Sequence, residues 1–338
     1  MEKVLTVCIP TYNMEALLGR CLESFISDQK TMEKLEILVV NDGSKDKSSQ
    51  IGHEYEVRYP GTFKVIDKPN GNYGSCINAS LKVATGKYFR ICDADDRYEK
   101  SNLKEYIEFL QNKEVDIVFT PFTTLDFNSR PIKTSAIPNL LSDEIYYLDN
   151  IDWSKKTFSE SRAMHCIAVK TPLLIENKYF QTEGISYTDT QFVFYSTLYA
   201  ETCSFFSKTI YLYYLGRDGQ TMSSASRIKS YKQFYKNADR MLHDYVKLPA
   251  TISKNKSILL FDSIAVLTLY YMDVVLGKVN KDKESEKKLR QMIELSKTSH
   301  LPCPLVDYLS INKRFVLWYR YRISPNIIYF VYKLLGRI

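Results

Sequence analysis

The sequence predicts an α/β fold, a mostly parallel sheet with helices on both faces, followed by a C-terminal helical region. Three observations predict it. Short apolar runs alternate with amphipathic segments over the first 120 residues, and polar residues follow each run. After about residue 226 only long helical patterns remain. Alternation of strand and helix is typical of a parallel sheet whose ligands bind at the carboxyl ends of the strands.

The apolar runs define the expected strands, which lie at residues 4–9, 35–40, 63–66, 88–92 and 115–120. Between them, apolar residues at helical spacing form one stripe over residues 17–25 and another over residues 103–110. Asn13 and Ser101 precede these stripes and are expected to cap the two helices. The turns after the first four strands are rich in polar residues, so one binding edge is expected there.

The fourth of these turns is the most informative, because it holds Asp93, Asp95 and Asp96 within four residues. Carboxylates packed this tightly repel one another unless a cation, a ligand or a proton relieves them. Mg²⁺ or Mn²⁺ shared with phosphate oxygens suits such a cluster, which favours a substrate that carries a diphosphate. The alternative is a solvated acidic turn that caps the next helix, since so short a motif often occurs without a function.

Three stretches carry a resemblance to a known family: VCIPTYN, EILVVNDGSKDKS and NGNYGSCINASLKVATGKYFRICDADD. In this order and at this spacing they resemble the nucleotide-binding half of family 2 glycosyltransferases, which have the GT-A fold. The resemblance is close over residues 5–98 and continues more loosely to about residue 225. It implies a GT-A catalytic domain over residues 1–225, followed by a helical region over residues 226–338. A length of 338 residues leaves room for both.

The resemblance also implies roles for residues of this chain. Asp42 would read a uracil base, while Pro10, Tyr12 and Asn13 would wrap the nucleoside. A fixed carboxylate can accept a charge-assisted hydrogen bond from the N–H of uracil, although the segment 41–44 is also a good turn sequence.

For the acidic turn, the resemblance implies that Asp93 contacts the ribose or the metal and that Asp95 ligates the metal. Asp96 would lie behind these two residues or cap the next helix. The metal expected by this resemblance is Mn²⁺ or Mg²⁺.

Sugar transfer with inversion requires a base, because a hydroxyl is a poor nucleophile near neutral pH. Asp189 is the best candidate. It lies in GISYTDTQF, which resembles the family's Glu-Asp motif at the start of a helix, with Thr188 in place of the first acid. The alternative is that Asp189 only caps the helix expected at residues 190–199.

Two further residues are candidates on the donor or acceptor side. The segment 211–221 resembles one that closes the donor site in non-processive family members, and Arg217 could steady the diphosphate there. An ordinary surface arginine is the alternative. The Gln-x-x-Arg-Trp motif of processive synthases is absent, so transfer of a single sugar is expected. His165 resembles an acceptor-side or phosphate-side residue, but a lone histidine beside an apolar strand is often a satisfied core group.

The C-terminal region is expected to contain helices at residues 231–247, 256–279, 281–297 and 312–338. The second is apolar enough to span a membrane, but Asp262 and Asp273 interrupt it, so it is expected to be buried. The last carries six basic residues, no acidic residue and many aromatic residues, in a chain of net charge +7. This pattern fits an amphipathic anchor on an anionic membrane. The alternatives are packing on the catalytic domain and a nucleic-acid contact, for which no recognition motif exists.

The seven cysteines form no C-x-x-C pair, so reduced, buried thiols are expected. No secretory signal opens the chain. The protein is therefore expected in the cytoplasm, peripheral on the inner face of the cell membrane.

The expected function is metal-dependent, inverting transfer of one sugar from a UDP-linked donor to a saccharide hydroxyl. By resemblance, the acceptor would be a polyprenyl-diphosphate-linked precursor of a bacterial surface polysaccharide. Two alternatives remain. A sugar nucleotidyltransferase would need a glycine-rich basic loop where this chain has residues 10–13, and a non-catalytic nucleotide-sugar-binding protein would not need Asp189.

Overall fold

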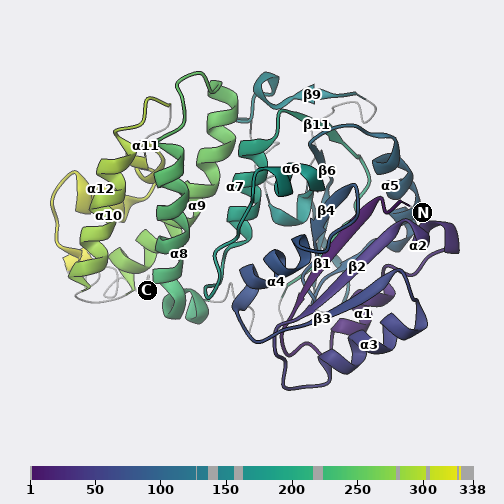
Figure 1. Ribbon diagram of the computed structural model, residues 1–338. Helices are drawn as coiled ribbons and strands as arrows, with labels where there is room; N and C mark the ends of the chain where they lie inside the picture. Colours follow the sequence, from purple (N-terminus) through teal and green to yellow (C-terminus); the bar gives the residue numbers. More distant parts are fainter. Residues whose placement is uncertain are drawn as a thin grey trace. The chain divides into compact units, whose positions relative to one another are not determined.

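The computed structural model describes residues 2–126, 128–135, 144–155, 163–215, 224–278, 282–301, 305–325 and 327–328. The chain divides into two compact units, residues 1–217 and residues 218–338, which we call the catalytic unit and the helical unit (Figure 1). The sequence analysis places this division between residues 225 and 226. Every described residue of the candidate site belongs to the catalytic unit.

The catalytic unit is built on an eight-stranded sheet with the order β3-β2-β1-β4-β10-β6-β11-β9. Figure 1 shows β3, β2, β1 and β4 side by side. Its strands are β1 Leu5–Thr11, β2 Leu35–Asn41, β3 Phe63–Asp67, β4 Tyr88–Ile91, β6 Ile117–Phe119, β9 Tyr146–Tyr147, β10 Ile167–Lys170 and β11 Thr202–Phe205. The first four strands are parallel, and β10 runs antiparallel between β4 and β6. The predicted α/β fold with a mostly parallel sheet is confirmed.

Helices cover both faces of this sheet, because the side chains of each strand alternate between the two faces. The helices are α1 Leu18–Glu23, α2 Gln29–Glu33, α3 Ser48–Arg58, α4 Asn72–Leu81, α5 Lys100–Asn112, α6 Thr171–Glu176 and α7 Asp189–Tyr199. Val7 of β1 belongs to a core that includes residues of α1, α3 and α5. On the opposite face, Cys8 accepts a hydrogen bond from Ser80 of α4, and Phe89 of β4 packs on Phe192 of α7.

Two predicted helix caps are wrong. Helix α1 begins after Leu17, and Asn13 lies further upstream with a positive φ of 53°. Its side-chain oxygen instead accepts from the backbone N–H of Lys45, so Asn13 joins the first loop to the second. Helix α5 is capped by Glu99, whose carboxylate accepts from the N–H of Ser101. In both cases a tertiary or neighbouring partner competes with the expected cap.

A second sheet, which the sequence analysis does not predict, has the order β5-β12-β7-β8. Its strands are β5 Arg97–Tyr98, β7 Phe122–Leu125, β8 Pro131–Thr134 and β12 Tyr211–Tyr214. Residues 97–98 pair with residues 211–212, directly after the acidic turn. The pairing therefore brings a tyrosine-rich strand to Asp93, Asp95 and Asp96.

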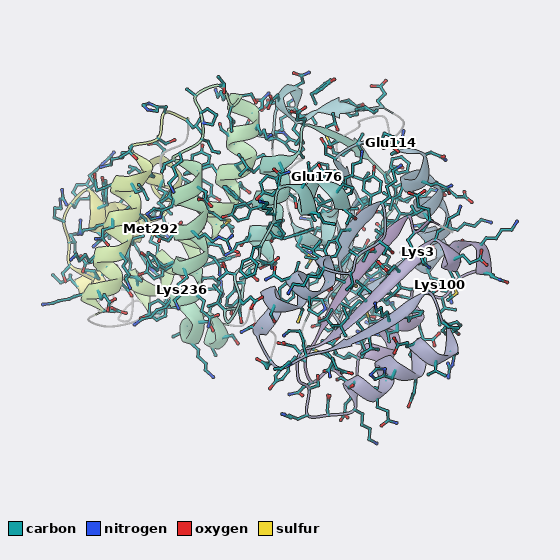
Figure 2. All side chains as sticks on the ribbon, viewed as in Figure 1. Lys3, Lys100, Glu114, Glu176, Lys236 and Met292 are labelled. Atoms are coloured by element: carbon teal, nitrogen blue, oxygen red, sulfur yellow. The ribbon has the colours of Figure 1, made fainter. Side chains whose placement is uncertain are left out.

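The helical unit contains α8 Ser224–Tyr245, α9 Lys254–Gly277, α10 Lys283–Ser296, α11 Leu305–Leu309 and α12 Lys313–Tyr319. Figure 2 shows how densely side chains fill this unit, where Met292 of α10 is buried. Among the described residues, α9 is the one helix long and apolar enough to cross a membrane, and 67% of its most apolar stretch is buried in the protein. This burial agrees with the prediction made from Asp262 and Asp273, the two acidic residues that interrupt the apolar stretch.

The predicted helix over residues 312–338 is wrong in extent, because α12 ends at Tyr319 and Arg322 follows with a positive φ of 59°. Phe315 and Trp318 are buried, and the indole N–H of Trp318 donates to Glu286 of α10 at 2.8 Å. These two aromatic residues are therefore packed within the helical unit. The basic and aromatic residues from 329 onward lie outside the described residues.

Candidate active site

The acidic turn follows β4 at the carboxyl end of the sheet, as predicted. Ligand oxygens of Asp93, Asp95 and Asp96 all lie within 4.8 Å of one another. Asp93 and Asp95 are partly exposed, whereas Asp96 is buried. Three hard oxygen donors at this spacing are suited to Mg²⁺ or Mn²⁺.

Asp96 has a different role from its two neighbours. Its carboxylate accepts from the hydroxyl of Tyr211 at 2.6 Å and from the backbone N–H of Tyr214 at 2.8 Å. Burial, followed by repulsion from Asp93 and Asp95, raises the pKa of Asp96 well above its ordinary value. Since α5 is capped by Glu99, the alternative role of Asp96 as a helix cap is wrong. Asp96 ties the acidic turn to β12, and Asp93 and Asp95 remain as the residues that fit an ion.

The backbone of the acidic turn is held from α1. Arg20 donates to the carbonyl oxygen of Asp95 at 2.8 Å, and its guanidinium lies 3.8 Å from the ring centre of Tyr214. A second cation, Arg97, lies 5.4 Å from the same ring. Cation–π contacts of this kind stabilise a guanidinium that is withdrawn from water. The turn therefore has a fixed backbone beneath its two partly exposed carboxylates.

Asp42 is almost fully buried and is held by the start of α4. One carboxylate oxygen accepts from Lys68 at 2.5 Å and from the N–H of Gly71 at 2.9 Å. The other accepts from the N–H of Asn72 at 2.9 Å. The predicted base-reading carboxylate is thus fixed by a lysine and by the N-terminus of a helix, where negative charge is favoured.

The residues predicted to wrap the nucleoside lie beside Asp42. The N–H of Asp42 donates to the carbonyl oxygen of Thr11 at 2.8 Å, which places Pro10 and Tyr12 next to it along β1. Asn13 is bonded to Ser44 and Lys45 of the following loop, and Tyr12 is 47% exposed. The structure therefore brings the predicted nucleoside residues together, with Tyr12 accessible to a ligand.

Asp189 is the first residue of α7, behind Thr188. Burial raises the pKa of Asp189 above its ordinary value. Tyr73 and Tyr213 are each within electrostatic reach of both Asp189 and Asp93. The charges of the predicted base and of Asp93 therefore act on the same two tyrosines.

Thr188, which stands where the family motif has an acid, is buried. Its hydroxyl and its carbonyl oxygen accept from the side-chain amide of Gln181 at 2.8 and 3.0 Å. The hydroxyl thus fixes the start of α7 without a charge.

His165 fits neither sequence interpretation completely. Its ring stacks on Tyr213 at a centroid distance of 5.2 Å and an angle of 11°, and its Nε2 is buried without a hydrogen-bond partner in the described part of the chain. Burial, with a smaller effect of Arg90, lowers the pKa of His165 to about 3. The imidazole is therefore neutral near pH 7 and supports the tyrosine strand. Arg217, the other donor-side candidate, lies outside the described residues.

The sequence analysis misses four tyrosines around the acidic turn: Tyr73, Tyr211, Tyr213 and Tyr214. The hydroxyl of Tyr73 donates to Asp93 at 2.8 Å, and that of Tyr211 accepts from the N–H of Asp93 at 3.1 Å. The alternation in Tyr211-Leu212-Tyr213 is a signal for a strand, but nothing local indicates its partner.

A cavity of about 590 Å³ lies elsewhere, at the amino ends of β1 and β4. Its lining includes Lys3 and Glu114, both labelled in Figure 2, and also Lys87 and Lys170. Lys87 and Lys170 share the carboxylate of Glu114 at 2.5 and 3.2 Å. The ligand-binding edge of such a sheet is the opposite one, so we assign the site to the acidic turn.

This mostly parallel sheet, with the carboxylate cluster at its carboxyl end, is a fold of the GT-A type. Residues 6–165 match the sequence model of "Glycosyl transferase family 2". Over these residues, just under half of its length, the chain is similar to members of this family.

Three similar proteins extend the comparison. The minor teichoic acid biosynthesis protein GgaB of Bacillus subtilis is 35% identical over 34% of this chain and 13% of its own length. Crystalline TarS 1–349 of Staphylococcus aureus, in complex with UDP-GlcNAc, has a TM-score of 0.64 at 22% identity and covers 98% of this chain and 92% of its own. The mannosyltransferase PcManGT of Pyrobaculum calidifontis, in complex with GDP-Man and Mn²⁺, has a TM-score of 0.53 at 15% identity, covering 100% of this chain and 89% of its own.

The structural likenesses establish the fold. The sequence matches are shorter, covering 40% or less of GgaB and of two further curated relatives.

Proposed function

We propose that this protein is a metal-dependent, inverting glycosyltransferase that moves one sugar from a UDP-linked donor to a hydroxyl of a saccharide acceptor. The observation that carries the proposal is that the first turn of α4 joins the acidic turn to the segment that leads into Asp189. Tyr73 of this turn donates to Asp93 at 2.8 Å, and the carbonyl oxygen of Gly71 accepts from the N–H of Gly184 at 2.9 Å. One carboxylate is suited to the diphosphate end of a donor and the other to the incoming hydroxyl.

The order of the groups along the sheet edge supports a nucleoside diphosphate. Asp42 is joined to the first turn of α4, and Tyr73 of the same turn reaches Asp93. A base read at Asp42 and a diphosphate near Asp93 and Asp95 would thus lie on two sides of one helical turn. The complex of TarS with UDP-GlcNAc supports uracil as the base.

The transfer step uses Asp189 as the proton acceptor. The acceptor hydroxyl oxygen forms a bond to the anomeric carbon as the bond from that carbon to the diphosphate oxygen breaks. The hydroxyl proton passes to Asp189, and the electron pair of the broken bond leaves with the nucleoside diphosphate. A partly buried carboxylate with a raised pKa is a stronger base once it is ionised, which suits this role.

A divalent ion held by Asp93 and Asp95 would neutralise charge that builds on the leaving diphosphate. The protein residues around it fix the site: Asp96 anchors the turn to β12, and Arg20 holds the carbonyl of Asp95. Arg217 is proposed to assist the diphosphate on the strength of the sequence resemblance alone.

The acceptor is proposed to be a lipid-linked saccharide of a bacterial surface polymer, and the likeness to GgaB supports this setting. We further propose that the protein works at the inner face of the cell membrane. In the described part of the helical unit, the exposed large apolar side chains are Ile311, Tyr321 and Ile327, all in one segment. The same segment carries exposed cations, which suits an anionic lipid surface.

The test compares Asp189→Asn with Asp95→Ala in the presence of Mn²⁺, a panel of nucleotide sugars and saccharide acceptors. We expect Asp189→Asn to bind UDP in a metal-dependent way but to release UDP from donors at least 100-fold more slowly than wild type. Asp95→Ala should lose both binding and transfer. Glu108→Gln, an exposed acid of α5, is the matched control and should behave as wild type.

Three outcomes would contradict the proposal. Near wild-type transfer by Asp189→Asn would remove Asp189 as the base. Binding of a donor without release of UDP in the presence of competent acceptors would favour the non-catalytic binding protein. Release of pyrophosphate from a nucleoside triphosphate and a sugar phosphate would favour the nucleotidyltransferase.

A further inference from the structure

The first turn of α4, residues 71–75, contacts Asp42, Asp93 and the segment that leads into α7. At its beginning, the N–H groups of Gly71 and Asn72 donate to the carboxylate of Asp42, both at 2.9 Å. Asn72 has a positive φ of 69°, and its side-chain oxygen accepts from the N–H of Tyr73 at 2.8 Å. The position of Tyr73 is therefore fixed from the side of the predicted base-reading residue.

The same turn is joined to the segment that leads into α7. The N–H of Gly184 donates to the carbonyl oxygen of Gly71 at 2.9 Å. Gly74 lies so close to this segment that a Cβ atom on it would come within 2.1 Å of the carbonyl oxygen of Thr182. Residues 181–188 connect directly to Asp189, so the turn that carries Tyr73 has little freedom to move against the start of α7.

Tyr73 spans the remaining distance to the acidic turn. Its hydroxyl donates to one carboxylate oxygen of Asp93 at 2.8 Å. Burial, followed by repulsion from Asp93 and Asp189, raises the pKa of Tyr73 well above its ordinary value, so the hydroxyl stays a proton donor. A carboxylate with one oxygen held in this way is restricted in its orientation.

We propose that Tyr73 is a positioning residue that orients Asp93 for the divalent ion and so determines how tightly the ion binds. The inference rests on the proposed function, because that function assigns the ion to Asp93 and Asp95. Partners that hydrogen-bond to a metal ligand fix its orientation, and their removal typically weakens metal binding by 10- to 100-fold. Tyr73 acts through Asp93 and does not itself need to touch the substrate.

The experiment is Tyr73→Phe, which removes the hydroxyl and keeps the ring. Mn²⁺ is titrated into the full chain in the presence of UDP, with free Mn²⁺ followed by electron paramagnetic resonance, and UDP binding is measured separately in EDTA. We expect Mn²⁺ affinity to fall about tenfold or more, with UDP affinity in EDTA unchanged. A merely structural role would weaken both or lower the melting temperature without this selectivity.

Tyr55→Phe is the matched control, because the hydroxyl of Tyr55 donates to the carboxylate of Glu23 at 2.7 Å outside the candidate site. It should leave Mn²⁺ affinity unchanged. If Tyr73→Phe does not fold, difluorotyrosine is placed at position 73, which keeps the ring and makes the hydroxyl a stronger hydrogen-bond donor. Mn²⁺ affinity should then change, while UDP affinity in EDTA should stay the same.

Suppose that the wild-type protein binds Mn²⁺ and transfers sugar, and that Tyr73→Phe binds Mn²⁺ as tightly as wild type. This result would overturn the inference about Tyr73 and leave the proposed function standing. Failure of the wild-type protein to bind Mn²⁺ with UDP would instead contradict the proposed function.

Discussion

Two aspartates of the catalytic unit show how surroundings separate residues of the same type. Burial raises the pKa of both Asp96 and Asp189. Asp96 accepts from Tyr211 and from the backbone of β12, which makes it a structural link. At Asp189, backbone hydrogen bonds at the start of α7 oppose this rise in pKa. Its carboxylate is therefore the one suited to proton transfer.

The raised pKa of Asp189 predicts the acid limb of the pH profile. A protonated Asp189 cannot accept the hydroxyl proton, so kcat/KM should fall tenfold per pH unit below this pKa, with a midpoint above the ordinary value of 3.8. The measurement is kcat/KM from pH 4 to pH 8, with Mn²⁺ and UDP binding measured at each pH to separate donor-site titration. A profile that stays flat down to pH 4 while binding is retained would contradict the assignment.

At the scale of single elements, α4 shows why a glycine in a helix can be required by packing. Gly74 lies in α4, where a glycine normally costs stability relative to alanine. Here the missing side chain allows Thr182 to approach closely, since its carbonyl oxygen would lie 2.1 Å from an added Cβ. This glycine permits close approach of the protein's own backbone.

Gly74→Ala is therefore expected to destabilise the catalytic unit by about 1–3 kcal/mol, because the segment before α7 must move away. Gly19→Ala is the matched control: Gly19 also lies in a helix, α1, and an added Cβ would have no atom within 4 Å. It should be neutral or stabilising by up to about 1 kcal/mol. Urea unfolding followed by circular dichroism measures both, and equal effects of the two substitutions would contradict the packing argument.

At the scale of the whole molecule, each unit has its own buried core. The basic residues of the C-terminal segment differ in burial and pairing. Arg314 pairs with Asp273 of α9 at 2.8 Å and is largely buried. Lys313, Arg320 and Arg322 are exposed. In the described part of the segment, packing thus uses one cation and two aromatic residues, while Lys313, Arg320 and Arg322 stay exposed, as the proposed membrane contact requires.

We expect the protein to sediment with vesicles that contain phosphatidylglycerol and to bind pure phosphatidylcholine vesicles at least tenfold more weakly. The double substitution Arg320→Gln and Arg322→Gln should weaken binding about 25-fold, since each basic residue near an anionic surface contributes about 1 kcal/mol. Lys64→Gln with Lys82→Gln, two exposed lysines of the catalytic unit, is the control. Equal binding to both kinds of vesicle would contradict the membrane proposal.

Local patterns were sufficient to predict much of this protein. The strands β1 to β4 and the helices α1 and α5 follow from apolar periodicity, because burial on a sheet face imposes period two and burial of a helix stripe imposes period 3.6. Topology then places the ends of parallel strands together, so Asp42 and the acidic turn could be assigned to one edge before any contact was known. The long helices α8, α9 and α10 were predicted for the same reason.

The sequence by itself determined the α/β class, the chemistry of the acidic turn and the identity of the carboxylates that can serve it. Only the tertiary structure decided which groups surround them. Tyr211 meets Asp96 across 115 residues of chain, and Tyr73 meets Asp93 from another element. The orientation of a metal ligand depends on such distant partners, and periodicity along the chain carries no information about them.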